Sequence, residues 1–199
     1  ECKMRLGDKN GFPINMYESS VKVPMIMSQP GVIEPGTVNS SLLSAYDFMP
    51  TLLDYVGIEG TDRGEKLPGK SFLPALLGQE FHQGESIVVM DEYGPNRMIR
   101  GTRYKFIKRY PYGPNELYDL QEDPGERRNL LLAGNEKDEE IGRTMNYELE
   151  QWFINYVNPE IDGAKEPVFG SGQIGLAGLW SKGEVSHSCD DYIKEKLKE

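Results

Sequence analysis

Short stretches in which apolar and polar residues alternate, separated by turn-forming residues, fill the middle of the chain. They predict four strands, at 86–92, 96–100, 103–110 and 115–120. Tight connections join these strands, so we expect an antiparallel meander with one face buried and one face in contact with water.

A helical period follows the predicted strands. A helix over about 137–157 is predicted, because five apolar residues recur at steps of four, four, three and four residues. These residues are Ile141, Met145, Leu149, Trp152 and Tyr156. The Asn158-Pro159 pair ends the helix. We expect the apolar stripe to cover the buried face of the meander, which is a common α+β arrangement.

The first part of the chain has a different pattern. The run Val21–Met27 ends in three apolar residues between Pro24 and the Pro30-Gly31 turn, without alternation. This predicts a strand buried on both faces, as in a parallel sheet. Few similar segments accompany it, so most of its sheet is expected to lie outside these residues. An exposed apolar patch with a tendency to self-associate is then expected at this run.

Two short helices are predicted next. The first has Asp47 as its N-cap residue, places Pro50 at the third helical position, and ends at Gly57. The segment Ser71–Gly78 repeats this pattern. Residues 160–199 are rich in glycine and then in charged residues, which predicts an irregular tail with a short helix over 192–198.

Composition narrows the classes of function. The chain has 199 residues, with 22 Lys and Arg against 32 Asp and Glu, for a net charge of −10. This balance argues against a nucleic-acid partner and against adhesion to anionic lipid. No apolar run approaches the roughly 20 residues of a membrane-spanning helix, so no membrane partner is expected. The two cysteines, Cys2 and Cys189, leave the redox compartment undecided.

The chemistry-bearing residues do not add up to a complete active site. The segment His187–Asp191 holds an imidazole, a thiol and two carboxylates. A zinc site takes about four ligands, usually in two separated pairs, and no second pair occurs. The adjacent Asp91 and Glu92 point to opposite faces of a strand. No nucleophile lies beside a base, and no phosphate-binding glycine-rich loop is present.

Basic residues are concentrated in the third predicted strand. They are Arg103, Lys105, Lys108 and Arg109. Arg103 and Lys105 share one face of the strand, and Lys108 takes the other. Two interpretations stay open for this group: a solvated surface that keeps the sheet edge soluble, or a weak anion-binding patch.

Several segments, taken in order and with their spacing, resemble the later part of the sulfatase family, within the alkaline-phosphatase-like superfamily. The segments are Met16–Pro24, Asp47–Ile58, Gly69–Gly78, Met98–Ile107 and Glu116–Glu126. The fourth is similar to the family's small C-terminal sheet, and the fifth to the closing signature of the same domain. The resemblance covers about residues 13–157.

The resemblance implies an α+β fold with three parts. These are the end of an α/β sulfatase domain over 1–82, a small four-stranded antiparallel sheet packed on a long C-terminal helix over 83–158, and an irregular tail over 159–199. It also implies hydrolysis of sulfate esters on sugars or aryl groups. In that reaction a formylglycine made from Cys or Ser attacks sulfur, and a divalent cation, usually calcium, holds the sulfate. A periplasmic, secreted or lysosomal-like location is implied as well.

The sequence departs from the family pattern at the nucleophile. The family motif Cys/Ser-x-Pro/Ala-x-Arg does not occur, and Cys2 does not fit it. The family's metal-binding aspartate pairs belong to its earlier half. We therefore expect no complete catalytic set, no metal ligands and no bound cofactor in this chain. In the family a lysine before the Met-Tyr-Glu segment contacts the sulfate, and Lys9 is its nearest match, with Lys3 a poorer one.

Three hypotheses follow. In the first, the chain is the C-terminal part of a sulfatase, inactive alone, whose partner in the complete enzyme is a sulfated glycan or an aryl sulfate. In the second, it is a non-catalytic module whose basic group Arg103, Lys105, Lys108 and Arg109 binds an anionic glycan. In the third, it belongs to a phosphate-ester hydrolase of the same superfamily. Self-association through exposed sheet elements is also expected.

Overall fold

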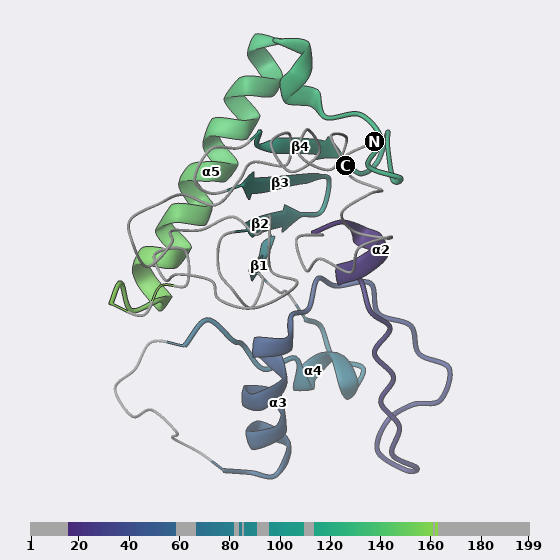
Figure 1. Cartoon of the computed structure of the whole chain (residues 1–199). Coiled ribbons are helices and arrows are strands. Elements are labelled where there is room, and N and C mark those ends of the chain that lie inside the picture. Colours follow the sequence, from purple (N-terminus) through teal and green to yellow (C-terminus); the bar gives the residue numbers. More distant parts are fainter. Residues whose placement is uncertain are drawn as a thin grey trace, which may run out of the picture. The chain divides into compact units, whose positions relative to one another are not determined.

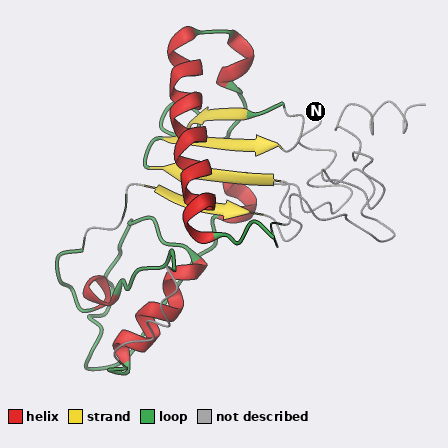
Figure 2. Cartoon of the chain, turned by 90° about the vertical axis from the view of Figure 1, so that its left-hand side faces the viewer, coloured by secondary structure: helices red, strands yellow, loops and turns green. Residues whose placement is uncertain are grey.

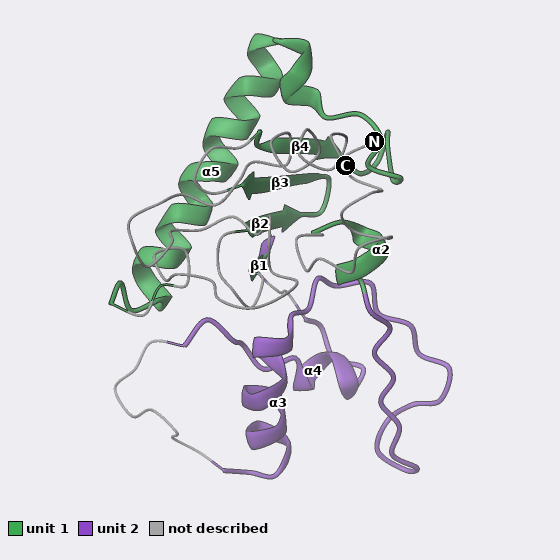
Figure 3. Cartoon of the chain, viewed as in Figure 1, with its two compact units in different colours: residues 1–22, 88–199 green, residues 23–87 purple. Residues whose placement is uncertain are grey.

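A computed structural model describes residues 16–58, 67–81, 84, 86–90, 96–109, 114–160 and 162. By its contacts the chain divides into two compact units, residues 1–22 with 88–199, and residues 23–87 (Figure 3). Residues 16–22 therefore group with the small sheet, whereas the sequence-based boundaries placed them in the range 1–82.

A four-stranded sheet in the order β1-β2-β3-β4 belongs to the first unit, except that the first two residues of β1 fall in the range of the second (Figure 1). The strands are β1 Ser86–Met90, β2 Asn96–Gly101, β3 Tyr104–Arg109 and β4 Glu116–Asp119. The pairs β2–β3 and β3–β4 are antiparallel, with Met98 opposite Ile107 and Lys105 opposite Tyr118. The predicted four-stranded antiparallel sheet is confirmed, and the predicted strand ranges agree with the structure to within a few residues at each end.

The long helix α5, Glu136–Tyr156, crosses one face of this sheet (Figure 2). The Asn135 side chain caps it by accepting a hydrogen bond from the Lys137 amide at 3.0 Å. The core between helix and sheet consists of Val88, Ile99, Phe106, Leu117, Met145, Leu149 and Phe153. The predicted helix is confirmed, with one correction to its apolar stripe. Phe153 rather than Tyr156 is buried at its C-terminal end, and Tyr156 is 39% exposed.

The opposite face of the sheet is also covered, so the predicted water-facing surface is wrong. The short helix α2, Glu18–Val21, and the two residues before it lie on this face. A second apolar cluster forms there from Met16, Tyr17, Met98, Ile107, Tyr118 and Leu120. Local alternation in the strands did not reveal this cover, because it comes from residues far earlier in the chain.

The connection from β4 to α5 is ordered by its own short-range contacts. A 3-10 turn, η3 Leu130–Ala133, follows Asn129 and brings Leu130 and Leu131 against the core. Gly134 then takes a left-handed conformation, with φ 63°, which favours glycine because it has no Cβ. The turn directs the chain back along the sheet into α5.

The second unit contains η2 Ala45–Asp47, α3 Phe48–Tyr55 and α4 Leu73–Leu76. Helix α3 begins after Asp47, with Pro50 at its third position as predicted. Asp47 occupies the N-cap position of α3 as predicted, but its carboxylate makes no capping hydrogen bond to this helix. It accepts hydrogen bonds from the Ser44 amide at 2.8 Å and the Lys70 amide at 2.9 Å. Asp47 thus closes a capping box with Ser44 around the preceding turn and ties residue 70 to it.

The run Val21–Met27 is not a strand in the structure. Val21 ends α2, and the residues after it adopt no regular structure. Val23 is 74% exposed and Ile26 is 90% exposed, and Met25 is exposed too. The exposed apolar patch that the sequence predicted is present, and self-association through it stays a prediction.

Several sequence predictions lie outside the described residues. They concern Cys2, Lys3, Lys9, Asp91, Glu92, the segment His187–Asp191, Cys189 and the helix over 192–198. Among the described helices, none is both long enough and apolar enough to cross a membrane.

Candidate functional site

The face of the sheet covered by residues 16–21 carries charged side chains within its apolar cluster. Alternation along β2 and β3 places Arg100 and Lys105 on this face, beside Met98 and Ile107. The Lys105 side chain is completely buried. A buried ammonium is stable only where acceptors replace its water shell, so the surroundings of Lys105 define the site.

The Lys105 ammonium has three oxygen partners, which matches its three N–H donors. Its Nζ lies 2.8 Å from Glu18 Oε1 and 2.9 Å from Glu126 Oε1. It also donates to the Met16 carbonyl oxygen at 3.0 Å. Two of these three partners, Met16 and Glu18, belong to the N-terminal segment. Lys105 therefore joins the third strand to a segment far away in sequence, since Met16 precedes it by 89 residues.

Glu126 reaches Lys105 from an unusual backbone position. Its φ is 51°, in the left-handed region that non-glycine residues rarely adopt, and such strain costs roughly 1–3 kcal/mol. The turn before it is held by Asp123, whose carboxylate accepts hydrogen bonds from the Arg127 and Arg128 amides at 2.6 and 2.8 Å. Glu126 Oε2 accepts a further bond from the Glu18 amide at 2.6 Å. One carboxylate oxygen of Glu126 thus binds the Lys105 ammonium, and the other binds the Glu18 backbone amide.

Glu18 is shared between two cations. Besides Lys105, it accepts hydrogen bonds from Arg100 Nε at 3.3 Å and Nη2 at 3.5 Å. Burial by itself raises the pKa of Glu18, but the hydrogen bonds and charges of Lys105 and Arg100 outweigh it and hold the pKa below its usual value of 4.5. We call Glu18, Arg100, Lys105 and Glu126 the anchor cluster.

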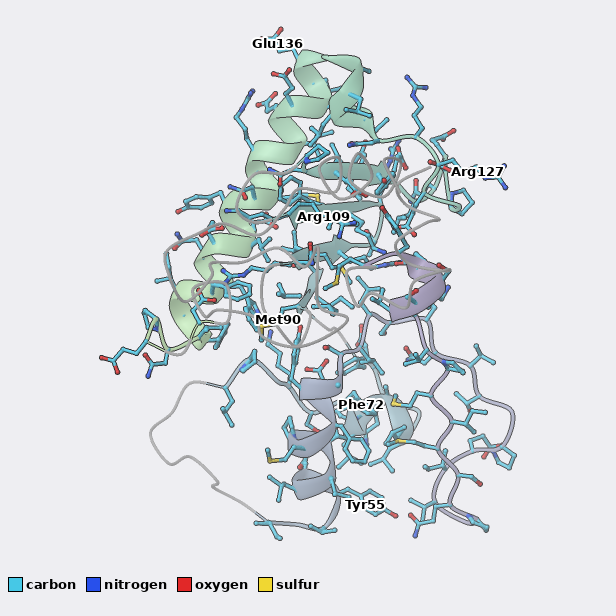
Figure 4. All side chains as sticks on the ribbon, in the orientation of Figure 1. Tyr55, Phe72, Met90, Arg109, Arg127 and Glu136 are labelled. Atoms are coloured by element: carbon cyan, nitrogen blue, oxygen red, sulfur yellow. The ribbon has the colours of Figure 1, made fainter. Side chains whose placement is uncertain are left out.

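A second polar group adjoins the anchor cluster around Glu116. The Tyr17 and Tyr118 hydroxyls donate to Glu116 Oε2 at 2.9 and 2.6 Å, and Arg109 Nε donates to Oε1 at 3.0 Å. Burial, together with the Glu116 carboxylate, raises the pKa of both tyrosines above the usual value of 10.0. Both hydroxyls therefore stay neutral donors over the physiological range. Arg109 is labelled on the sheet in Figure 4.

The basic group predicted from the sequence, Arg103, Lys105, Lys108 and Arg109, forms ion pairs in the structure. Arg103 donates two hydrogen bonds to Asp119 Oδ2, at 2.9 and 2.7 Å, which hold the pKa of Asp119 below its usual value. Lys108 pairs with Glu150 of α5, and Arg109 pairs with Glu116. Each of the four basic side chains has a carboxylate partner. The solvated-surface interpretation is wrong for Lys105, which has no exposed side chain.

Substrate contact by Lys9, Arg103 or Lys105 stays a prediction. Lys9 lies outside the described residues. The Arg103 side chain is 46% exposed beside Asp119, whereas Lys105 is enclosed by the anchor cluster. Sequence reasoning missed Glu18 and Glu126 as the partners of Lys105. The available signal was Ile107, which shares the face of Lys105 in the strand: an apolar residue two positions away indicates a buried face, on which a lysine requires a partner of opposite charge.

The calcium ion that the family resemblance implies for the complete enzyme stays a prediction. No group of three or more His, Cys, Asp or Glu side chains among the described residues is placed to hold a metal ion. Glu18 and Glu126, which do approach one another, face the Lys105 ammonium. Lys105 and Arg100 together place two positive charges beside these two carboxylates.

The polar residues of the closing signature, Glu116–Glu126, form hydrogen bonds within the small domain. The Asp119 carboxylate accepts hydrogen bonds from Arg103 and, at 3.1 Å, from the Gln121 backbone amide. The Asp123 carboxylate accepts a hydrogen bond from the Arg127 amide in the turn that follows. Glu126 accepts a hydrogen bond from Lys105 and so belongs to the anchor cluster. Asn129 then accepts the Leu117 and Leu131 amides at 3.0 and 3.1 Å. The polar residues of the signature thus bind the backbone and cations of the small domain.

Comparison with known proteins identifies this architecture. Residues 12–154 match the family model of the N-sulphoglucosamine sulphohydrolase C-terminal region. The chain therefore belongs to the sulfatase family, through the C-terminal domain of that family.

Individual relatives agree with this assignment. The chain is 36% identical over 126 residues to a Delta 4,5-hexuronate-2-O-sulfatase of Bacteroides thetaiotaomicron, covering 59% of this chain and 26% of the relative. It is 27% identical over 216 residues to an ulvan-active sulfatase of Formosa agariphila, covering 90% of this chain and 41% of the relative. The chain thus spans less than half the length of these relatives.

A solved structure supports the fold alone. A phosphonate monoester hydrolase from Silicibacter pomeroyi superposes with a TM-score of 0.52 at 17% sequence identity. The superposition covers 81% of this chain and 32% of that one.

Proposed function

We propose that the 199 residues supply the C-terminal part of a sulfate-ester hydrolase. The match of residues 12–154 to a sulphohydrolase C-terminal domain carries this proposal. The substrate class that it favours is a sulfated sugar, because one relative is named for a hexuronate 2-O-sulfate and another for its activity on ulvan. An aryl sulfate serves as a convenient surrogate substrate.

In this proposal, Lys9 provides positive charge at the sulfate group. A sulfate monoester develops negative charge on its leaving oxygen during hydrolysis, so a fixed cation beside it stabilises the transition state. The nucleophile and the calcium ligands come from residues outside this sequence, which contains no Cys/Ser-x-Pro/Ala-x-Arg motif. The chain alone is then expected to leave sulfate esters intact.

Neither alternative function is favoured by an observation in the structure. A glycan-binding module built on the basic group would need unpaired cations, and all four of its side chains pair with carboxylates. A phosphate-ester hydrolase would rest on the phosphonate hydrolase superposition, which at 17% identity shows fold only.

Two assays test the proposal. The purified 199 residues are incubated with a fluorogenic aryl sulfate and calcium, and no turnover above buffer is expected. In parallel, the chain replaces the matching C-terminal region of the Bacteroides hexuronate sulfatase, and hydrolysis of that enzyme's own sulfated substrate is measured. Activity of this exchange enzyme, absent when the C-terminal region is deleted, supports the proposal. Turnover by the isolated chain, or an exchange enzyme that melts cooperatively and is inactive, refutes it.

A further inference from the structure

The anchor cluster lies at one end of the segment that carries Lys9. Met16 and Glu18 both contact Lys105, and Lys9 lies seven residues before Met16 in the sequence. Seven residues span at most about 25 Å when fully extended. The position of Met16 and Glu18 on the sheet therefore limits the volume within which Lys9 can lie.

We propose that Lys105 is a positioning residue, which fixes the point where the Lys9-bearing segment joins the small sheet. From strand β3, the Lys105 ammonium binds the Met16 carbonyl oxygen and the Glu18 carboxylate of the segment. The Glu126 carboxylate accepts hydrogen bonds from both Lys105 and the Glu18 backbone amide. The relevance of this attachment to sulfate binding rests on the proposed function, whereas the attachment itself does not.

The charged contacts of Lys105 hold the segment that begins at Met16 at one position on the sheet, which apolar packing alone does not do. Removing the ammonium would take away the cation that lies 2.9 Å from Oε1 of the Glu126 carboxylate, which is only 3% exposed, and losing such a cation beside a buried charge is strongly unfavourable. Glu18 would keep Arg100, at 3.3 Å, as a cation partner. The loss therefore falls on the contact between Glu126 and the segment, including the hydrogen bond from the Glu18 amide.

Four backbone amides report on the attachment. The Glu18 amide donates to Glu126, the Ser20 and Val21 amides donate to the Tyr17 carbonyl at 2.8 and 3.0 Å, and the Lys22 amide donates to the Glu18 carbonyl at 3.0 Å. Amide hydrogen exchange at these sites measures local opening of the segment. The amides of Phe106 in β3 and Leu149 in α5, both in the other core, report on the sheet and helix themselves.

The experiment measures hydrogen exchange by NMR in the full 199-residue chain and in Lys105→Met. We expect exchange at the four segment amides to accelerate at least tenfold more than at Phe106 and Leu149. The matched control is Lys108→Met, which removes a lysine of the same strand that pairs with Glu150 on the helix-covered face. It should not accelerate the segment amides selectively. Equal acceleration at all sites in Lys105→Met, or none at the segment, overturns the proposal.

Two further variants keep the test decisive. If Lys105→Met does not fold, Glu18→Gln removes one charge while Lys105 keeps Glu126 and the Met16 carbonyl, and selective acceleration of about tenfold is expected at the segment amides. Unchanged exchange in Glu18→Gln overturns the proposal. If Lys105→Met combined with Glu126→Gln restores wild-type protection of the segment, apolar packing suffices and the role of the ammonium is refuted. These readouts need no sulfate ester, so they stay separate from failure of the hydrolase assays.

Discussion

The side-chain oxygen of Asn129 accepts a hydrogen bond from the backbone amide of Leu117 at 3.0 Å. Leu117 is fully buried in β4, the edge strand of the sheet, while Asn129 stands at the start of the turn that leads to α5. The Asn129 amide group also donates to the Asn115 carbonyl at 3.0 Å. One side chain therefore satisfies backbone groups of the edge strand and fixes where the chain turns toward the helix.

Replacing Asn129 by alanine removes these bonds and leaves the backbone amides of Leu117 and Leu131 without the side-chain oxygen that accepts from them. We expect the free energy of unfolding to fall by about 1–2 kcal/mol, measured by urea denaturation. Asn146→Ala in α5 is the matched control, because Asn146 has no side-chain hydrogen bond among the described residues, and it should be neutral or slightly stabilising. An equal effect of the two variants would contradict the role of Asn129.

The contact between α5 and the sheet predicts a large cavity effect at Leu149. This side chain is fully buried in the core, so Leu149→Ala should lower the free energy of unfolding by about 2–5 kcal/mol. Ile154→Ala on the same helix removes an exposed side chain and should change it little. Thermal or urea unfolding measures both. A small effect at Leu149 would mean that α5 does not form a core with the sheet.

In the second unit, Thr51 links α3 to the segment before α4. Its hydroxyl donates to the Asp47 carbonyl at 2.6 Å and accepts from the Phe72 amide at 3.0 Å, and both Thr51 and Phe72 are buried. Thr51→Val keeps the shape but leaves the Phe72 amide without its acceptor. We expect a local cost of about 1–3 kcal/mol, seen as faster hydrogen exchange at Phe72.

The control for Thr51 is Thr144→Val in α5. Thr144 also donates to the carbonyl four residues earlier, at Glu140, but it is exposed and accepts no described bond. The Phe72 amide should be unaffected in this variant. Unchanged exchange at Phe72 in Thr51→Val would show that the threonine hydroxyl is not its acceptor.

Glu18 gives the stability of the first unit a pH dependence of known sign. Since its pKa is held below the usual 4.5 in the folded state, its charge stabilises the fold above that pH, and the contribution is lost as the pH falls through the lowered pKa. Glu18→Gln should therefore be less stable than the wild type at about pH 6, and the difference should shrink below about pH 4.5. Urea midpoints across roughly pH 3–7 measure it. Exposed Glu148→Gln is the control, and a gap that stays constant with pH would contradict the assignment.

The sequence predicted those elements whose patterns are local. The four strands and α5 follow from alternation and from the helical period, both of which depend on neighbouring residues. The cover on the second sheet face did not follow, because Met16 and Tyr17 reach it from far away in the chain. Local reasoning likewise assigned Lys105 to the surface, since its partners Glu18 and Glu126 lie 87 and 21 residues away.

The run Val21–Met27 shows a different limit. Its apolar residues predicted burial in a sheet, but a strand needs neighbours for its backbone hydrogen bonds. In the described part of the chain, residues 23–28 have no such neighbour, and the side chains of Val23 and Ile26 are exposed. The lack of partner strands in the sequence thus predicted the exposed apolar surface correctly, whereas the apolar run itself did not predict the conformation.

The most direct test of the account addresses Lys9, the cation that these residues are proposed to bring to the sulfate. In the exchange enzyme, Lys9→Ala should lower kcat/KM for the sulfated hexuronate at least about a hundredfold, because a cation at a developing negative charge contributes several kcal/mol in a water-excluded site. Lys3→Ala, six residues away, should leave kcat/KM within about twofold of the exchange enzyme by the same argument, since it provides no such contact. Full activity of Lys9→Ala, or equal losses in the two variants, would contradict the account.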